Sequence, residues 1–228
     1  MTAAPATLAI RFMLGFAVLA VGPLLVWDVL QRCGVVPIDP DRGTNLEGSM
    51  LAFAVAALAI GALAWRLPAA LPFRPARAAV VVGTYVPFAL GWVALLVGYL
   101  RLVACEPQPA LDYLATAPVG RPGFWVVVFA IVVAAPFAEE VVFRGYLQGA
   151  LLGVLRPPVA IGLTAVVFGL AHGLPYALPL ALLGALFGAI AYRCRSLGAS
   201  MFAHALHNGL TVLVTVAWPG SLDFLYRR

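Results

Sequence analysis

The sequence predicts an all-α fold, a polytopic transmembrane helical bundle of about seven spans. Of its 228 residues, 64% are hydrophobic and only 10% are charged, and the mean hydropathy is +1.02. A soluble domain of this size needs far more charge on its surface. Several apolar runs are long enough to cross a bilayer as helices, and no alternating ten-residue pattern indicates a membrane β-barrel.

Seven apolar segments are the expected spans, and polar or proline-rich connectors separate them. The first run lacks the basic start of a signal peptide and is too long for its apolar region, so we expect it to be retained. The connector from Cys105 to Gly123 is long and proline-rich, and it could lie on the membrane surface or cover an entrance. The expected spans are Leu8–Leu30, Ser49–Trp65, Ala78–Val103, Phe124 to about Leu151, Val159–Leu174, Tyr176–Tyr192 and Leu197–Trp218.

The arginines predict the orientation, because basic residues favour cytoplasmic loops. The fourteen basic residues are all arginine and lie mostly between apolar runs, a distribution that argues against nucleic-acid binding. Three of them follow the second span and two lie in Arg193–Arg195, which a seven-span topology puts on one side. We therefore expect a cytoplasmic N-terminus, although the two C-terminal arginines then fall on the opposite side.

Cys33 and Cys105 are expected just outside the non-cytoplasmic ends of the first and third spans. In an oxidising compartment they could form a disulfide. The simpler interpretation, which we favour, is two unrelated small residues.

Ionisable residues are scarce in the predicted spans, and their positions are informative. Glu139 and Glu140 are the only acidic residues deep inside a span, and all three histidines, His172, His204 and His207, lie inside later spans. Charged groups at membrane depth cost several kcal/mol unless they are paired or hydrated, so they are candidates for function.

The spacing around Glu139 and Glu140 separates two roles. Glu140 and Arg144 are four residues apart, so on a helix they share a face and can form an ion pair. Glu139 is rotated by about 100° and is free to face another space. Pro136, one turn earlier, could kink the helix and admit water.

His204 and Asn208 repeat the spacing of four, as do Phe168 and His172. A histidine and an asparagine that point into one cavity supply two hydrogen-bond donors, as an oxyanion-stabilising site requires. Any one of these histidines could equally be a hydrogen-bond donor between helices. His207 is best interpreted as such a satisfied core residue. Gly145, Gly149 and Gly153, like Gly184 and Gly188, are interpreted as sites of close helix packing.

Three motifs together resemble one family. "EEVVFR" is similar to the EExxxR motif of the CPBP (CAAX protease and bacteriocin-processing, or Abi) family, "FGLAH" to its FxxxH motif, and "HALHN" to its HxxxN motif. The match covers Gly123 to about Trp218. It divides the chain into an N-terminal three-span region without family motifs, residues 1–122, and a CPBP-like four-helix catalytic core within residues 123–228.

The resemblance implies a glutamic-type intramembrane endopeptidase without a cofactor. Glu139 is similar to the base that activates a water, and His172 to the residue that holds this water. His204 and Asn208 resemble the pair that stabilises the tetrahedral oxyanion. Glu140 and Arg144 resemble the supporting pair, and Phe168 occupies the aromatic position that shapes the cavity.

Two other functions stay open at this point. Glu139, His172, His204 and His207 could together hold Zn²⁺ and a water, which would make the protein a zinc-dependent metalloprotease. No HExxH helix supports this alternative, and Asn208 is a poor zinc ligand. The chain could also be a non-catalytic membrane protein with an immunity, scaffold or proton-path role.

The substrate is expected to be a membrane-associated protein or peptide. A C-terminal anchor or sorting signal, a leader peptide and a CAAX-like tail are the classes that the resemblance implies. The high content of Ala, Gly and Arg without Lys suggests a GC-rich bacterial genome, and hence a bacterial cytoplasmic membrane. This makes a prenylated tail of eukaryotic type the least expected substrate.

Overall fold

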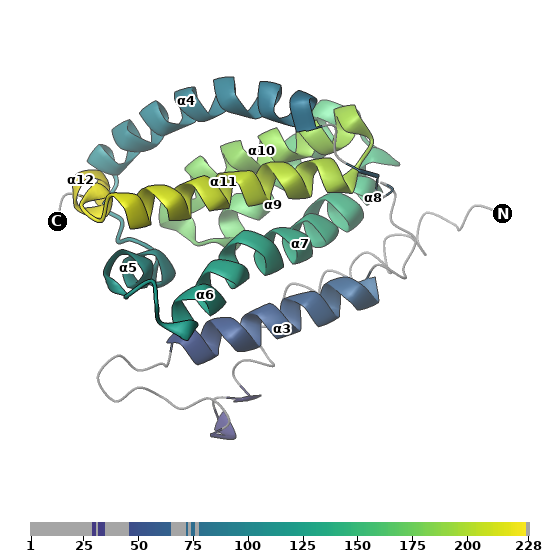
Figure 1. The fold of residues 1–228 in the computed structure, drawn as a ribbon. Helices are drawn as coiled ribbons and strands as arrows, with labels where there is room; N and C mark the ends of the chain where they lie inside the picture. Colours follow the sequence, from purple (N-terminus) through teal and green to yellow (C-terminus); the bar gives the residue numbers. More distant parts are fainter. Residues whose placement is uncertain are drawn as a thin grey trace.

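The computed structural model describes residues 29–30, 32–34, 46–64, 72, 74–75 and 78–226, and every regular element among them is helical (Figure 1). The longest helical run is continuous from residue 122 to residue 152 and includes two π-helical segments, η2 and η3. The elements are α3 (Leu46–Ala64), α4 (Ala78–Leu102), α5 (Pro109–Thr116), α6 (Pro122–Phe129), η2 (Ala130–Ala134), α7 (Ala135–Glu140), η3 (Val141–Gln148), α8 (Gly149–Leu152), α9 (Pro157–Ala171), the 3₁₀ turn η4 (Leu174–Tyr176), α10 (Ala177–Cys194), α11 (Leu197–Ala217) and α12 (Ser221–Tyr226).

Four helices in the described part of the chain are long and apolar enough to cross a membrane, so the protein is an integral membrane protein. They are Ala78–Leu102, Pro122–Leu152, Leu174–Cys194 and Leu197–Ala217. Two further apolar helices are shorter, at Leu46–Ala59 and Pro157–Ala171. The all-α membrane fold is therefore confirmed, and the count of seven spans is not. The expected first span, Leu8–Leu30, lies almost wholly outside the described residues.

Among the described elements, α11 contacts α4, α5, α7, α10 and η2. In Figure 1, α3 runs along α6 and α7 on one side, while α4 crosses the opposite side over α10 and α11. Ala54 and Ala57 of α3 form a buried cluster with Ala130 and Ala134 of η2. Small side chains let helix backbones approach closely where no hydrophobic effect drives association. The pairing of α3 with η2 therefore depends on alanine.

Glycines bring α10 against the helices that carry the motifs, which confirms the predicted packing role of Gly184 and Gly188. A Cβ atom added at Gly184 would lie 3.1 Å from Phe168 Cδ1, and one added at Gly188 would overlap Gln148 Oε1. A larger residue at either position would push α10 away from α9 and η3. Cys33 and Cys105 are both free thiols in the structure, so the possible disulfide between them is not formed.

Candidate active site

Three side chains from three separate helical segments converge on one point. Glu139 lies in α7, His172 ends α9, and His204 lies in the middle of α11. Glu139 Oε2 is 3.8 Å from His172 Nε2 and 3.9 Å from His204 Nε2. This oxygen is shielded from solvent, and it has no hydrogen-bond partner among the described residues. The structure thus brings together the carboxylate and the two imidazoles that the sequence singled out.

The end of α9 fixes the orientation of His172. The backbone N–H of His172 bonds to Gly169 O, which leaves Phe168 O for the imidazole, and His172 Nδ1 lies 2.8 Å from that oxygen. A carbonyl oxygen can only accept a hydrogen bond, so Nδ1 carries a proton and donates it. In the neutral ring, Nε2 therefore presents a lone pair toward Glu139.

Glu140 is fully buried and binds two cationic or potentially cationic groups through one oxygen. Arg144 Nη1 donates to Glu140 Oε1 at 2.8 Å, and both side chains are 0% exposed. His204 Nδ1 lies 3.0 Å from the same oxygen. The predicted Glu140–Arg144 ion pair is confirmed. Its second contact turns His204 so that Nε2, and not Nδ1, faces Glu139.

The far side of Arg144 is held by α10 and by aromatic rings. Arg144 Nη2 donates to Gly184 O at 2.8 Å, and one turn later Gln148 Nε2 donates to Gly188 O at 2.9 Å. The guanidinium carbon lies 6.0, 4.6 and 5.5 Å from three ring centroids, which belong to Phe143, Phe168 and Phe187. Two buried side chains and two glycine carbonyls thus form a ladder between η3 and α10.

Two members of this arrangement were missed by the sequence reasoning. Gln148 continues the spacing of Glu140 and Arg144 by another four residues, a polar stripe that the sequence does contain. Phe187 stacks on His204 with ring centroids 4.6 Å apart and an interplanar angle of 21°. Nothing in the sequence distinguishes Phe187 from other apolar residues of its span, so only the fold identifies it.

Asn208 binds a backbone carbonyl that the π-helical turn before Pro136 leaves without a helical donor. The N–H of Ala135 bonds to Ala130 O, and Pro136 has no N–H, so neither usual helical donor reaches Ile131 O. Asn208 Nδ2 donates to this carbonyl at 2.8 Å. One of the two amide N–H groups of Asn208 is therefore committed to the backbone of η2, and the other is not used by this bond.

His207 is separate from the cluster around Glu139. Its Nδ1 lies 3.0 Å from the Tyr85 hydroxyl of α4, and its ring contacts the ring of Trp92 edge-on at 4.9 Å. These contacts agree with the interpretation of His207 as a packed core residue. Among the described residues, no group of three or more His, Cys, Asp or Glu side chains is arranged to hold a metal ion.

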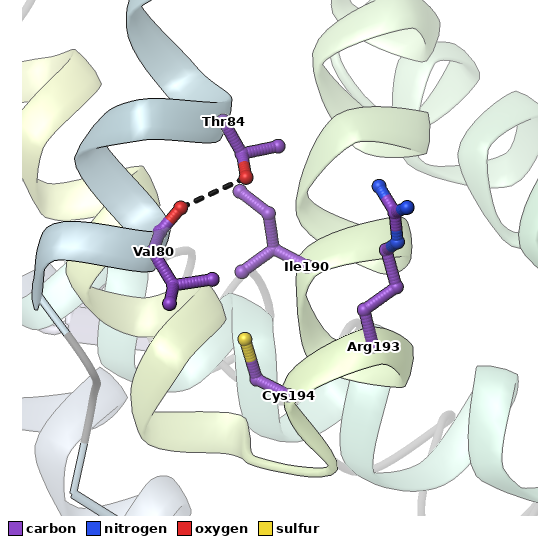
Figure 2. Close-up of a pocket in the computed structure, with 5 residues that line it drawn as sticks. All are labelled: Val80, Thr84, Ile190, Arg193 and Cys194. Atoms are coloured by element: carbon purple, nitrogen blue, oxygen red, sulfur yellow. Dashed lines mark hydrogen bonds between the residues drawn. The ribbon is translucent and has the colours of Figure 1, made fainter.

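A cavity among the described residues lies away from this cluster. It lies between α4 and the end of α10 (Figure 2), and its volume is about 360 Å³. Its lining consists of Val80, Thr84, Ile190, Arg193 and Cys194. None of the residues predicted for the site lines it.

The stretch of the chain that holds the three motifs matches the model of a known family. A family model described as "Type II CAAX prenyl endopeptidase Rce1-like" matches residues 121–210, which hold all seven predicted site residues. The resemblance to the CAAX-protease family is confirmed. This is a protease family, so the match supports peptidase activity in a membrane protein. No curated protein and no solved structure matches the chain.

Proposed function

We propose that the protein is a glutamate-dependent intramembrane endopeptidase that hydrolyses a peptide bond with a water activated by Glu139. The observation that carries this proposal is the position of Glu139 Oε2, 3.8 Å from His172 Nε2 and 3.9 Å from His204 Nε2. Two atoms about 3.8 Å apart can share one water at ordinary hydrogen-bond distances of about 2.8 Å. A buried carboxylate oxygen without a protein partner is a site where water is expected.

The donors and acceptors assign a role to each group. The water gives one hydrogen to Glu139 and the other to the free lone pair of His172 Nε2, so its own lone pair points at the substrate carbonyl. Glu139 takes the first proton as the new C–O bond forms. Electrons of the carbonyl π bond move to its oxygen, where His204 Nε2–H and the second amide N–H of Asn208 donate to the oxyanion. Glu139 then returns the proton to the nitrogen as the C–N bond breaks, which yields a carboxylic acid and an amine.

Glu140 and Arg144 support this chemistry without contacting the substrate. Their ion pair fixes Glu140 Oε1, and this oxygen holds His204 Nδ1. Phe168 lies beside both imidazoles, with centroid distances of 4.7 Å to His172 and 5.9 Å to His204. The substrate is a membrane-associated peptide segment, either a C-terminal anchor or CAAX-like tail or an N-terminal leader.

Comparative proteomics of protein termini tests this proposal and separates the substrate classes. Membranes from cells that express the wild type, Glu139→Gln or Glu106→Gln are compared for new N- and C-termini. Glu106→Gln is the matched control, because Glu106 is exposed in the connector before α5. We expect the same new termini with the wild type and Glu106→Gln, and their loss with Glu139→Gln. Termini that persist in Glu139→Gln would refute the assignment of the base.

A further inference from the structure

We propose that Phe187 is a positioning residue that stabilises the doubly protonated, cationic form of His204, which is the form able to donate to the oxyanion. The catalytic use of this charge rests on the proposed function, whereas the charge of His204 itself can be measured without any turnover. It concerns a residue that lies outside the three motifs and touches no reacting atom.

The geometry around His204 requires a cation if the ring is to donate toward the substrate. Nδ1 faces the carboxylate oxygen of Glu140 at 3.0 Å, and a carboxylate oxygen can only accept, so Nδ1 holds a proton. A neutral imidazole has one N–H, and Nε2 would then present a lone pair toward the Glu139 side. His204 can donate from Nε2 only when both nitrogens are protonated.

The charged groups around His204 act in opposite directions. Glu140 and Glu139 both attract a cation at His204, at 3.0 and 3.9 Å. Arg144 opposes it, because its guanidinium binds the same Glu140 oxygen at 2.8 Å. His172 also lies close to Glu139, with Nε2 3.8 Å from Oε2. His207 lies about one turn from His204 on α11. One buried carboxylate oxygen is therefore shared between a permanent cation and a potential one.

Phe187 supplies an additional favourable environment for this second cation. Its ring is 1% exposed and lies face to face with the imidazole at 4.6 Å and 21°. An aromatic face carries negative potential and attracts a cation, most strongly where water is excluded. The same ring centroid is 5.5 Å from the Arg144 guanidinium carbon, so Phe187 borders both positive groups that share Glu140.

The ladder between η3 and α10 holds Phe187 in this position. Gly184 and Gly188 flank Phe187 on α10, and their carbonyls accept hydrogen bonds from Arg144 and Gln148. His207 shows the contrast, because Phe187 meets it only edge-on, at 6.3 Å and 63°. The face of the ring is thus presented to His204 alone of these two histidines.

Nitrogen NMR of the histidine rings tests the proposal in nanodiscs, because the sequence contains only three histidines. The ring ¹⁵N shifts at fixed pH near neutrality give the ratio of doubly to singly protonated His204. We expect Phe187→Leu to lower this ratio about 2- to 30-fold, the range that a buried cation–π contact supports. Phe187→Tyr keeps the aromatic face and should keep the ratio within about twofold.

The controls separate the charge effect from loss of packing. Phe124→Leu removes the same volume from a buried ring in another cluster, with Tyr113 and Val127, and should leave the ratio unchanged. If Phe187→Leu does not fold, Phe187→Met offers an unbranched, flexible side chain that adapts to the same space without an aromatic face and carries the same expectation. An unchanged ratio in both Phe187 variants, or a wild-type His204 that is always singly protonated, would overturn the inference. Failure of the protease proposal would instead appear as cleavage that persists in Glu139→Gln.

Discussion

Replacing Arg144 by methionine should strongly destabilise the folded protein, because it leaves Glu140 buried without its cation. Arg144 and Glu140 are both 0% exposed and 2.8 Å apart, so water cannot take the place of the guanidinium. Breaking a buried pair by removing one partner costs about 3–5 kcal/mol. The variant also loses the hydrogen bond to Gly184 O and the contacts with three aromatic rings.

The assay is equilibrium unfolding in mixed micelles, with Glu140→Gln/Arg144→Met as the comparison. Gln at position 140 keeps an oxygen that can accept from His204 Nδ1 and removes the uncompensated charge. We expect the double variant to recover about 1–3 kcal/mol of the loss, as residues in direct contact do not act additively. A single variant within about 1 kcal/mol of the wild type, or a double variant less stable than the single one, would refute this explanation.

Three further predictions concern packing, hydrogen bonding and pH. Gly188→Ala should lower the free energy of unfolding by about 1–3 kcal/mol, because its Cβ would overlap Gln148. Gly162→Ala is the control, because a Cβ there meets open space, and it should not lower this free energy. Chemical denaturation compares the two variants. Asn208→Leu should cost about 1–3 kcal/mol by leaving the part-buried Ile131 carbonyl unpaired, and faster hydrogen exchange in η2 would accompany the loss. Burial and a hydrogen bond to a carboxylate raise the pKa of Tyr113 to about 12, so its proton is held more tightly in the folded protein than in the unfolded one. The stability that this provides is complete below pH 10 and lost through pH 12, and the difference in thermal midpoint between the wild type and Tyr113→Phe should shrink over that interval.

The residues that carry charge were predictable from the sequence because the membrane leaves few alternatives for them. A carboxylate and an arginine four residues apart inside a span must pair or be hydrated, and Glu140 and Arg144 do pair. The scarcity of histidine likewise pointed to His172 and His204. These predictions rest on the cost of burying charge in a membrane, and residue types and their spacing are enough to apply it.

The remaining features depend on backbone geometry and packing. The position of Asn208 follows from a π-helical turn that the spacing of apolar residues does not reveal, because every residue from Gly123 to Pro136 is apolar. Phe187 is one buried aromatic residue among many, and only the approach of α10 places it on His204. The count of seven spans stays a prediction, because α9 is apolar but short, at 15 residues, and Leu8–Leu30 lies almost wholly outside the described residues.

Single-turnover cleavage of an identified substrate by purified, chelator-treated protein tests the role of Glu139 most directly. We predict that the wild type keeps its rate after chelation and that Glu139→Gln loses about 10²- to 10⁴-fold, the contribution of a general base. Glu106→Gln should stay within about twofold of the wild type. A Glu139→Gln rate within tenfold of the wild type, or a rate abolished by chelation and restored by Zn²⁺, would contradict the account.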